Sequence, residues 1–571
     1  MSMCRVKKFL ALLFSISALT FISFDANAGD ITADSVWKNG KIYTADEKFS
    51  VVQAIAVKDG RIIYTGTSEG ADAYAGSGTA VNDLGGMTVI PGLNDAHLHY
   101  LSLGIGKLQI NAHWRPKEEI LNAVKEAAAK ARPGEWVLGR GWNQEVWDPA
   151  EFPTKEELDA VAPDVPVSLV RTCGHMTWVN SKAMELAGVS KDTPDPVGGE
   201  FIRDENGVPI GVMTDHAQEY INKIIPKTSP AQERDALIEA QRELVKFGIT
   251  SASDAGSNQR TIDILKELYT EDALKIRLDV MARVTGRPSA EELISGAGAF
   301  FAKGIQTGLF NDRMQVRSYK ISLDGSLGAR SAWMLSDYSD RPGHKGNGQL
   351  TDDELYQLVL DGHKSGFQLN SHAIGDAANR QVLDVYQRVL TEYPNFNHRF
   401  RVEHAQILTA EDLVRFSSLG VLPSMQTVHA TSDMNMAEER IGPKRIKFAY
   451  AWRQLLNSGT IIPNGTDAPV ELLDPWINLL AAVARRNSDL QPEDGWYPAE
   501  KLTREEALRS YTIWPAYASF EESKKGSLEN GKLADFIVID RDYMNCPDSE
   551  IKDIKVLKTI IAGESIYEIT E

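Results

Sequence analysis

The stretch Val89-Ile90-Pro91-Gly92-Leu93-Asn94-Asp95-Ala96-His97-Leu98-His99 joins a short apolar run to a Pro-Gly turn and then to two histidines. Side chains on a strand alternate between its two faces, so His97 and His99 are expected to point to the same side. Neutral imidazole is a good ligand for zinc and similar ions. Because a pair of histidines at this spacing is more often structural, the stretch alone only suggests a metal site.

Later apolar segments also carry residues that bind metals. These segments are residues 368–372, ending in His372, residues 400–404, ending in His404, residues 461–467, ending in Asp467, and residues 316–325, with Lys320 in the middle. Each residue alone has an ordinary explanation, such as a histidine bonded to backbone or a helix-capping aspartate. Taken together and in this order, they predict a common metal site.

The segments that carry these residues belong to a longer series of strands. We expect barrel strands near residues 87–97, 248–254, 277–283, 314–323, 367–372, 399–404, 420–424 and 460–466. Amphipathic stretches that favour helices lie between them, for example residues 352–365 and 377–393. This alternation predicts an α/β fold, a parallel (β/α)8 TIM barrel. In such barrels the C-terminal ends of the strands face the active site, which is where the candidate ligands fall.

The two ends of the chain read as short alternating strands with hairpin turns, such as Asn39-Gly40 and Asp59-Gly60. Neither end has enough strands to be stable alone, so we expect them to form one small β-sandwich from residues 29–86 and 515–571. The barrel then occupies residues 87–514, with a large insertion at about 100–241 after the first strand. Insertions there emerge at the catalytic face, so this one is expected to cap the site.

Residues 1–28 have the layout of a cleavable secretory signal. Arg5, Lys7 and Lys8 precede an apolar run over residues 9–24, and Ala26-Asn27-Ala28 supplies the cleavage site. An uncleaved anchor is the alternative, but the run is short for a membrane span. We expect a periplasmic or extracellular protein with no stable membrane insertion.

Composition indicates a globular protein, with 571 residues that are 43% hydrophobic and 25% charged. The net charge is −18, and removal of residues 1–28, with three basic residues and Asp25, would leave −20. So acidic a chain argues against nucleic acid and anionic membranes as partners, but the charge does not identify a substrate. The partners we expect are a small-molecule substrate and a second copy of the chain in a homodimer. Cys173 and Cys546 define no disulfide framework, and Cys173 is expected to be a buried structural thiol.

The phrases PGLNDAHLH, GRGWNQ, LVRTCGHMTWVNS, YKISLDGSLGAR, SHAIGDAANR, RVEHAQ and NGTDAPVE resemble those of the amidohydrolase superfamily. The resemblance is closest to amidohydrolase family 3, the subgroup of N-substituted formamide deformylase. It implies the composite sandwich and one or two divalent ions, with zinc favoured by the imidazole-rich set. It places Lys320 where the superfamily often has a carboxylated lysine that bridges two metals. The implied ligands are His97, His99, Lys320, His372, His404 and Asp467.

These ligands predict a metal-activated water that attacks an amide-type carbonyl. The resemblance implies hydrolysis of a non-peptide carbon–nitrogen bond, with a small amide or N-substituted formamide as the substrate. Asp467 is expected to act as base and then acid, while His404 helps to stabilise the oxyanion. The candidate substrate contacts are His175, Asp324, Arg330 and His429. Two alternatives remain open at this point: an esterase, lactonase or cyclic-imide hydrolase with the same site, and a noncatalytic sensor or regulator that retains the barrel.

Overall fold

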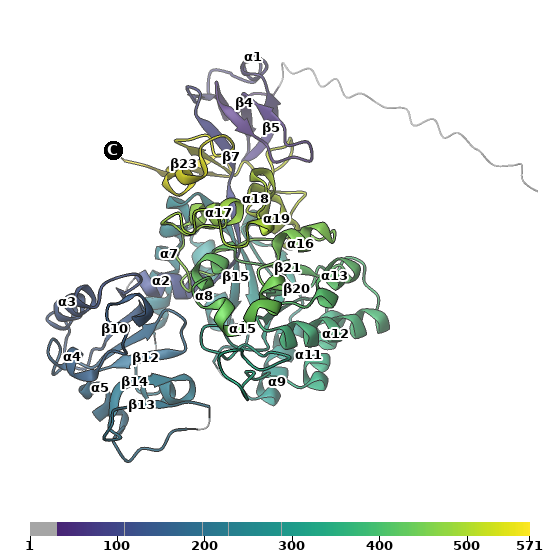
Figure 1. Cartoon of the computed structure of the whole chain (residues 1–571). Coiled ribbons are helices and arrows are strands. Elements are labelled where there is room, and N and C mark those ends of the chain that lie inside the picture. Colours follow the sequence, from purple (N-terminus) through teal and green to yellow (C-terminus); the bar gives the residue numbers. More distant parts are fainter. Residues whose placement is uncertain (1–30, 108, 197, 227, 287, 571) are drawn as a thin grey trace, which may run out of the picture.

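A computed structural model describes residues 31–107, 109–196, 198–226, 228–286 and 288–570 (Figure 1). Strands in these residues form four sheets: one in a barrel, two in a sandwich built from the chain ends, and one in an insertion. The expected export signal at residues 1–28 lies outside the described residues. Within the described part, no helix has both the length and the apolarity that crossing a bilayer requires.

The barrel sheet has the strand order β21-β20-β19-β18-β16-β15-β8, and every neighbouring pair is parallel. Its strands are β8 (Leu93–Leu98), β15 (Ile249–Ser257), β16 (Arg277–Ala282), β18 (Met314–Ser322), β19 (Gln368–Ala373), β20 (Arg401–His404) and β21 (Leu422–Ser424). Short β17 (Gln306–Gly308) pairs antiparallel with β18. Almost all residues of the barrel strands are buried, as expected for a parallel sheet with helices outside and a packed interior.

Helices connect the barrel strands and cover the sheet (Figure 1). They are α7 (Pro230–Lys246), α8 (Gln259–Thr270), α9 (Ala290–Phe301), α10 (Leu309–Asp312), α11 (Asp352–Lys364), α12 (Asp376–Glu392), α13 (Ala410–Leu419), α14 (Thr427–Asp433), α15 (Ala437–Arg445), α16 (Trp452–Asn457), α17 (Pro475–Ala484), α18 (Arg504–Ser510) and α19 (Ile513–Ala518). Capping boxes start α7, α9 and α11, because Ser229, Ser289 and Thr351 each pair with a Gln or Glu three residues later. The helices expected at 352–365 and 377–393 are α11 and α12.

The eighth barrel strand, expected at residues 460–466, is reduced to an isolated parallel bridge between Asn464 and Met425. Pro463 has no N–H to donate, which limits the ladder on this segment. The segment nevertheless closes the barrel. The Met425 N–H donates to the Pro463 carbonyl (3.0 Å) on one side, and the Ala96 N–H donates to the Asn464 carbonyl (2.9 Å) on the other. The (β/α)8 architecture is therefore confirmed, with an irregular last strand.

The first expected barrel strand, residues 87–97, is two strands in the structure. β7 (Thr88–Pro91) pairs with β2 and β22 in the sandwich, while β8 pairs with β15 in the barrel. The chain changes sheet at Gly92, where a Cβ atom would lie 2.2 Å from the Thr250 Oγ1. A single apolar run thus serves two domains, and one continuous strand was the wrong interpretation.

Strands from both chain ends form the sandwich. One sheet has the order β5-β4-β1-β6 and the other β24-β23-β22-β7-β2-β3. The strands are β1 (Ser35–Lys38), β2 (Lys41–Tyr43), β3 (Val51–Val52), β4 (Ala54–Lys58), β5 (Arg61–Gly66), β6 (Ala80–Asp83), β22 (Phe536–Ile539), β23 (Val556–Ile561) and β24 (Glu564–Glu568), with helix α1 (Ser68–Asp72). Trp37 and Phe536 meet edge to face with ring centroids 5.3 Å apart, so the core joins the two ends.

The insertion after β8 is a separate lobe on the side of the barrel away from the sandwich (Figure 1). Its sheet has the order β13-β14-β12-β11-β10-β9. The elements are α2 (Tyr100–Lys107), β9 (Ile110–Asn111), α3 (Lys117–Ala128), β10 (Val137–Trp142), α4 (Lys155–Asp159), β11 (Val167–Arg171), β12 (Met176–Val179), α5 (Ser181–Ala187), β13 (Phe201–Arg203), β14 (Pro209–Thr214) and α6 (Glu219–Asn222). Trp142 and Trp178 are fully buried in the core of this lobe.

Candidate metal centre and active site

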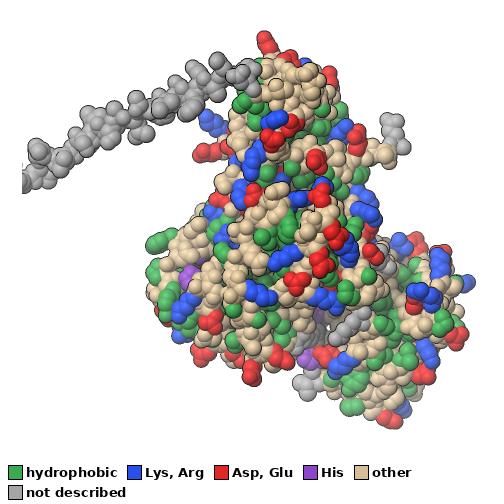
Figure 2. Space-filling model, turned by 180° about the vertical axis from the view of Figure 1, so that it is seen from behind, with side chains coloured by type: hydrophobic (Ala, Val, Ile, Leu, Met, Phe, Trp, Pro, Cys, Tyr) green, Lys and Arg blue, Asp and Glu red, His purple; other side chains and the backbone are tan. Residues whose placement is uncertain are grey.

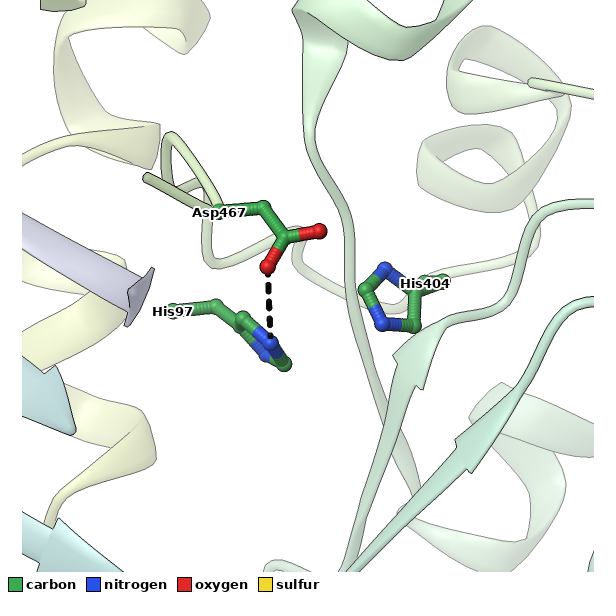
Figure 3. A group of neighbouring side chains, drawn as sticks. All are labelled: His97, His404 and Asp467. Carbon is green, nitrogen blue, oxygen red and sulfur yellow. Dashed lines mark ion pairs between the residues drawn. The ribbon is translucent and has the colours of Figure 1, made fainter. Parts of the chain in front are cut away.

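Three side chains meet at the C-terminal end of the barrel: His97 from β8, His404 from β20 and Asp467 just after the closing segment (Figure 3). One ligand-type atom from each lies within 4.8 Å of the others, and all three residues are buried. His404 (φ +75°) and Asp467 (φ +57°) have left-handed backbone, which is uncommon for non-glycine residues. Such conformations concentrate at functional sites, where the surrounding structure holds them in place.

Hydrogen bonds fix which nitrogen of each imidazole faces the cluster. His97 Nδ1 donates to Glu403 Oε2 (2.5 Å), and His404 Nδ1 donates to Gln426 Oε1 (2.7 Å). Because both acceptors are oxygens without a proton, Nδ1 carries the hydrogen in each ring and the Nε2 lone pair stays free. His97 Nε2 is buried without a hydrogen-bond partner. Both rings are therefore prepared as ligands.

The charge states of the cluster also suit a cation. Burial lowers the pKa of His97 to about 4 and that of His404 well below its ordinary value, so both rings are neutral at pH 7. Burial alone would raise the pKa of Asp467, but the neighbouring imidazoles, His99 first among them, hold it well below its usual range. Two neutral imidazoles and a carboxylate are the donors of many divalent-metal sites.

Unsatisfied polar atoms test whether a metal fits this cluster. Asp467 Oδ1 lies 3.2 Å from His99 Nε2 and 3.5 Å from His97 Nε2, but it has no well-aligned hydrogen bond. A buried carboxylate oxygen and a buried imidazole nitrogen without partners are costly, and a coordinated cation would satisfy both. The residues present therefore fit a divalent metal.

The remaining candidate ligands surround this group at different depths. His99 is partly exposed, and its Nε2 faces Asp467. The His372 ring lies 4.5 Å from the His404 ring between centroids, while its Nε2 lies 3.2 Å from the Gly325 carbonyl. His372 therefore contacts the cluster through its ring, while its Nε2 faces the Gly325 carbonyl and, at 3.3 Å, Asp324 Oδ1.

Lys320 in β18 is buried beside this cluster. Burial, above all, lowers the pKa of Lys320 to about 8, with Glu403 and Asp467 opposing the shift. Among the described residues, no carboxylate lies within 4.0 Å of its ammonium, and the carboxylate of Asp324, four residues later, is held by backbone N–H groups instead. The amine is unusually easy to deprotonate near neutral pH.

The four candidate substrate contacts occupy different places. His429, in α14, is in the site: its Nε2 lies 3.6 Å from Asp467 Oδ2, and its ring stacks on His404 at 5.7 Å. His175 belongs to the insertion and contacts Asp215 Oδ1 through its Nδ1 (2.8 Å). Cys173 beside it is a free, half-buried thiol rather than the fully buried one expected.

Asp324 and Arg330 bind parts of the chain itself. The Asp324 carboxylate accepts hydrogen bonds from the backbone N–H groups of Trp333 (2.9 Å), Ile374 (3.0 Å) and Gly375 (2.8 Å). The Arg330 guanidinium pairs with Asp340 at 2.7 Å. Both residues thus order the loop that follows β18 at the rim of the site.

Residues that the sequence did not single out complete the site. Glu403 and Gln426 orient the ligand histidines, and Arg140 of β10 brings the insertion to the site. The Arg140 guanidinium donates to the Thr172 carbonyl (3.1 Å), and the Thr172 hydroxyl lies 3.5 Å from the Val470 carbonyl, three residues after Asp467. Of these residues, only Glu403 could have been found from the sequence. It lies in an apolar segment, and an acid that is buried requires a partner.

Seen from behind, the insertion and the barrel are two lobes with a recess between them (Figure 2).

Comparison with known proteins identifies the family. The amidohydrolase family model matches residues 80–567. Protein LONG AFTER FAR-RED 3 of Arabidopsis thaliana is 32% identical over 98% of this chain and 96% of its own length. The putative amidohydrolase YtcJ of Bacillus subtilis is 31% identical over 94% and 99%. The N-substituted formamide deformylase of Arthrobacter pascens is 28% identical over 93% and 98%.

Solved structures agree with this assignment. The crystal structure of an uncharacterized metal-dependent hydrolase from Pyrococcus furiosus matches with a TM-score of 0.71 and 29% identity. The match covers 90% of this chain and 100% of that one. The resemblance stated from the sequence motifs is confirmed, and the chain belongs to the amidohydrolase family of hydrolases.

Proposed function

We propose that the protein is a metal-dependent hydrolase of a non-peptide carbon–nitrogen bond, in a small amide or N-substituted formamide. The observation that carries the proposal is the buried group of His97, His404 and Asp467, with two ligand atoms lacking any other partner. The substrate class follows the relative from Arthrobacter pascens, whose name is N-substituted formamide deformylase.

The chain offers His97, His404 and Asp467 to a first ion, with His99, His372 and Lys320 as further ligands. We favour zinc, because imidazoles dominate the set. The lowered pKa of Lys320, about 8, supports its reaction with CO2 to a carbamate, which would supply two oxygens to one or two ions.

The reaction needs an activated water and a proton carrier. A divalent ion held there would supply Lewis acidity and lower the pKa of bound water toward about 7. The two oxygens of Asp467 face different partners: Oδ1 lies toward His97 and His99, and Oδ2 lies 3.6 Å from His429 Nε2. Asp467 Oδ2 takes a proton from the attacking water and delivers it to the leaving nitrogen, giving a carboxylic acid and an amine. Asp467, His97 and His429 are buried, which limits the access of bulk water to the proton transfer.

The test combines metal analysis with a substrate panel. The purified protein should contain about one or two equivalents of a divalent metal per chain. Mass spectrometry at neutral pH should find the Lys320 carbamate as a labile gain of CO2. The metal-loaded protein should hydrolyse formamides and other amides faster than matched esters, lactones and cyclic imides. Exclusive ester cleavage would reject the proposed bond, and tight metal binding without any turnover would favour a sensor.

A matched pair of histidine variants distinguishes the loss of a metal ligand from the loss of a buried structural histidine. His404→Ala should lose metal and activity. His398→Asn changes another buried histidine, whose Nε2 bonds the Leu419 carbonyl (2.8 Å) before β20, and it should retain both. Full turnover by metal-free His404→Ala would contradict the proposal.

We also propose that the protein is exported to the periplasm or beyond. The support is the basic, apolar and Ala-x-Ala pattern of residues 1–28. N-terminal sequencing of the protein from fractionated cells should begin at or near Gly29.

A further inference from the structure

Arg283 stands at the catalytic rim without a carboxylate partner. It directly follows β16 (Arg277–Ala282), and its guanidinium donates to the Ser322 hydroxyl at 3.1 Å. Among the residues that the structure describes, no Asp or Glu lies within 4.0 Å of this guanidinium, although the chain carries a net charge of −18. Burial lowers the pKa of Arg283, which reflects a cation with little water around it.

The ladder of the barrel places this guanidinium beside the metal cluster. Ser322 is paired directly with His372 in the parallel ladder of β18 and β19. Ser322 and Lys320 are two residues apart on one strand, so their side chains share the barrel's inner side. The Arg283 head group therefore lies one strand from His372, at the level of the candidate ligands.

Three other arginines of the barrel differ from Arg283 because each pairs with an acid. Arg401 pairs with Glu403 (2.7 Å), Arg277 with Asp535 (2.6 Å) and Arg330 with Asp340 (2.7 Å). A poorly solvated guanidinium is costly unless an anion compensates it, and its planar fork matches a carboxylate with two parallel hydrogen bonds. A rim arginine left without an internal anion is therefore suited to an anion that arrives with the substrate.

We infer that Arg283 binds a carboxylate of the substrate, so that the preferred substrate is an amide that also carries a negative charge. This inference rests on the proposed function and narrows its substrate class. It assigns Arg283 to specificity rather than to the bond-breaking step.

The experiment compares two formamides that differ by one carboxylate: N-formylphenylalanine, as both enantiomers, and N-(2-phenylethyl)formamide. For the metal-loaded wild type, kcat/KM should be higher for one N-formylphenylalanine enantiomer than for the neutral compound. A charge-assisted bidentate contact is worth about 10- to 100-fold. Arg283→Gln should reduce the ratio of the two kcat/KM values by about this factor, and Arg283→Lys should restore part of it, since it keeps the charge without the fork.

Control variants and a binding measurement make the result decisive. Arg317→Gln changes an unpaired arginine on β18 that stacks on Phe520 at 3.5 Å, away from the ligands, and should leave the ratio unchanged. Calorimetric binding of the same two compounds reports the preference even without turnover. An anion preference in binding without hydrolysis would therefore keep this inference and reject the proposed function. The inference is overturned if wild type shows no anion preference, if Arg283→Gln retains it, or if only Arg140→Gln abolishes it.

Discussion

Glu403 determines which nitrogen of His97 faces the candidate metal site. It is fully buried between Arg401 and His97, and although burial favours the neutral acid, these two neighbours hold the pKa of Glu403 at about 2. The carboxylate thus accepts the Nδ1 hydrogen of His97 at any pH at which the protein functions. A carboxylate behind a ligand imidazole fixes the tautomer and increases the basicity of the opposite nitrogen.

Replacing this acid tests that role. Glu403→Gln is expected to weaken metal affinity by about 10- to 100-fold, because such partners of ligand histidines contribute that much. Competition with a chromogenic chelator, on protein shown to be folded by circular dichroism, measures the change. Asp412→Asn alters another fully buried acid, in α13 and bound to Arg380, and should leave metal affinity unchanged. Equal affinity of Glu403→Gln and wild type would contradict the role given to Glu403.

Spacing in the sequence predicted which candidate ligands lie together, but not their surroundings. His97, His404 and Asp467 each end an apolar segment, and strand ends of a barrel converge, so their meeting could be predicted. Asp324 accepts hydrogen bonds from backbone groups of its own loop and of the segment after β19, and its Oδ1 lies 3.3 Å from His372 Nε2. No side-chain pattern in the sequence encodes these backbone contacts. Arg283 looks ordinary in sequence, since what distinguishes it is the absence of a neighbouring acid in three dimensions.

At the scale of elements, the irregular closing segment approaches the backbone of β8 closely. A Cβ at Gly465 would lie 2.5 Å from the backbone nitrogen of His97 and 2.6 Å from Asp95 Oδ1. Asp95 in turn accepts hydrogen bonds from the backbone and the hydroxyl of Thr466, so the segment is held against β8. This close approach sets the distance between His97 and Asp467.

Gly465→Ala is therefore expected to push the closing segment away from β8. Overpacking of this kind costs about 1–3 kcal/mol of stability, and a displacement of about 1 Å at reacting groups costs about 100-fold in rate. Thermal unfolding and kcat measure the two effects. Gly298→Ala, in α9 with no atom within 4 Å of the added Cβ, should be neutral or stabilising with unchanged activity. Retention of wild-type kcat by Gly465→Ala would rule out this geometric control.

The elements that the sequence misjudged lie where tertiary structure overrides a local pattern. Residues 87–97 were expected to form one strand, but pairing with β22 on one side of Gly92 and with β15 on the other divides them. Residues 460–466 were expected to form a strand, but Pro463 interrupts the hydrogen-bond ladder and leaves an isolated bridge. Long amphipathic helices such as α11 and α12 could be predicted, because their periodicity and caps are local.

At the scale of the whole molecule, a buried ion pair joins the barrel to the sandwich. Arg277 begins barrel strand β16, and Asp535 immediately precedes sandwich strand β22. Arg277 Nε and one terminal nitrogen donate to the two oxygens of Asp535 at 2.6 and 2.9 Å. Asp535 also accepts from the backbone N–H groups of Ala562 (2.8 Å) and, through its carbonyl, Gly92 (3.0 Å). The point where the chain changes sheet and the point where the domains pair are thus one junction.

Removing one partner should destabilise this junction more than removing both. Asp535→Asn leaves the Arg277 cation, 2% exposed, without an anion, and such a loss costs about 3–5 kcal/mol. The double variant Arg277→Met/Asp535→Leu exchanges the pair for apolar contacts and should recover most of the thermal midpoint. Asp72→Asn, which breaks the exposed pair with Lys38, should leave the midpoint nearly unchanged. Because the pair lies at the opposite end of the barrel from the ligands, metal content of the folded fraction should stay at the wild-type level in every variant. A single variant as stable as wild type would show that water reaches the guanidinium, and that the sheet shared by β7 and β22 holds the domains together without it.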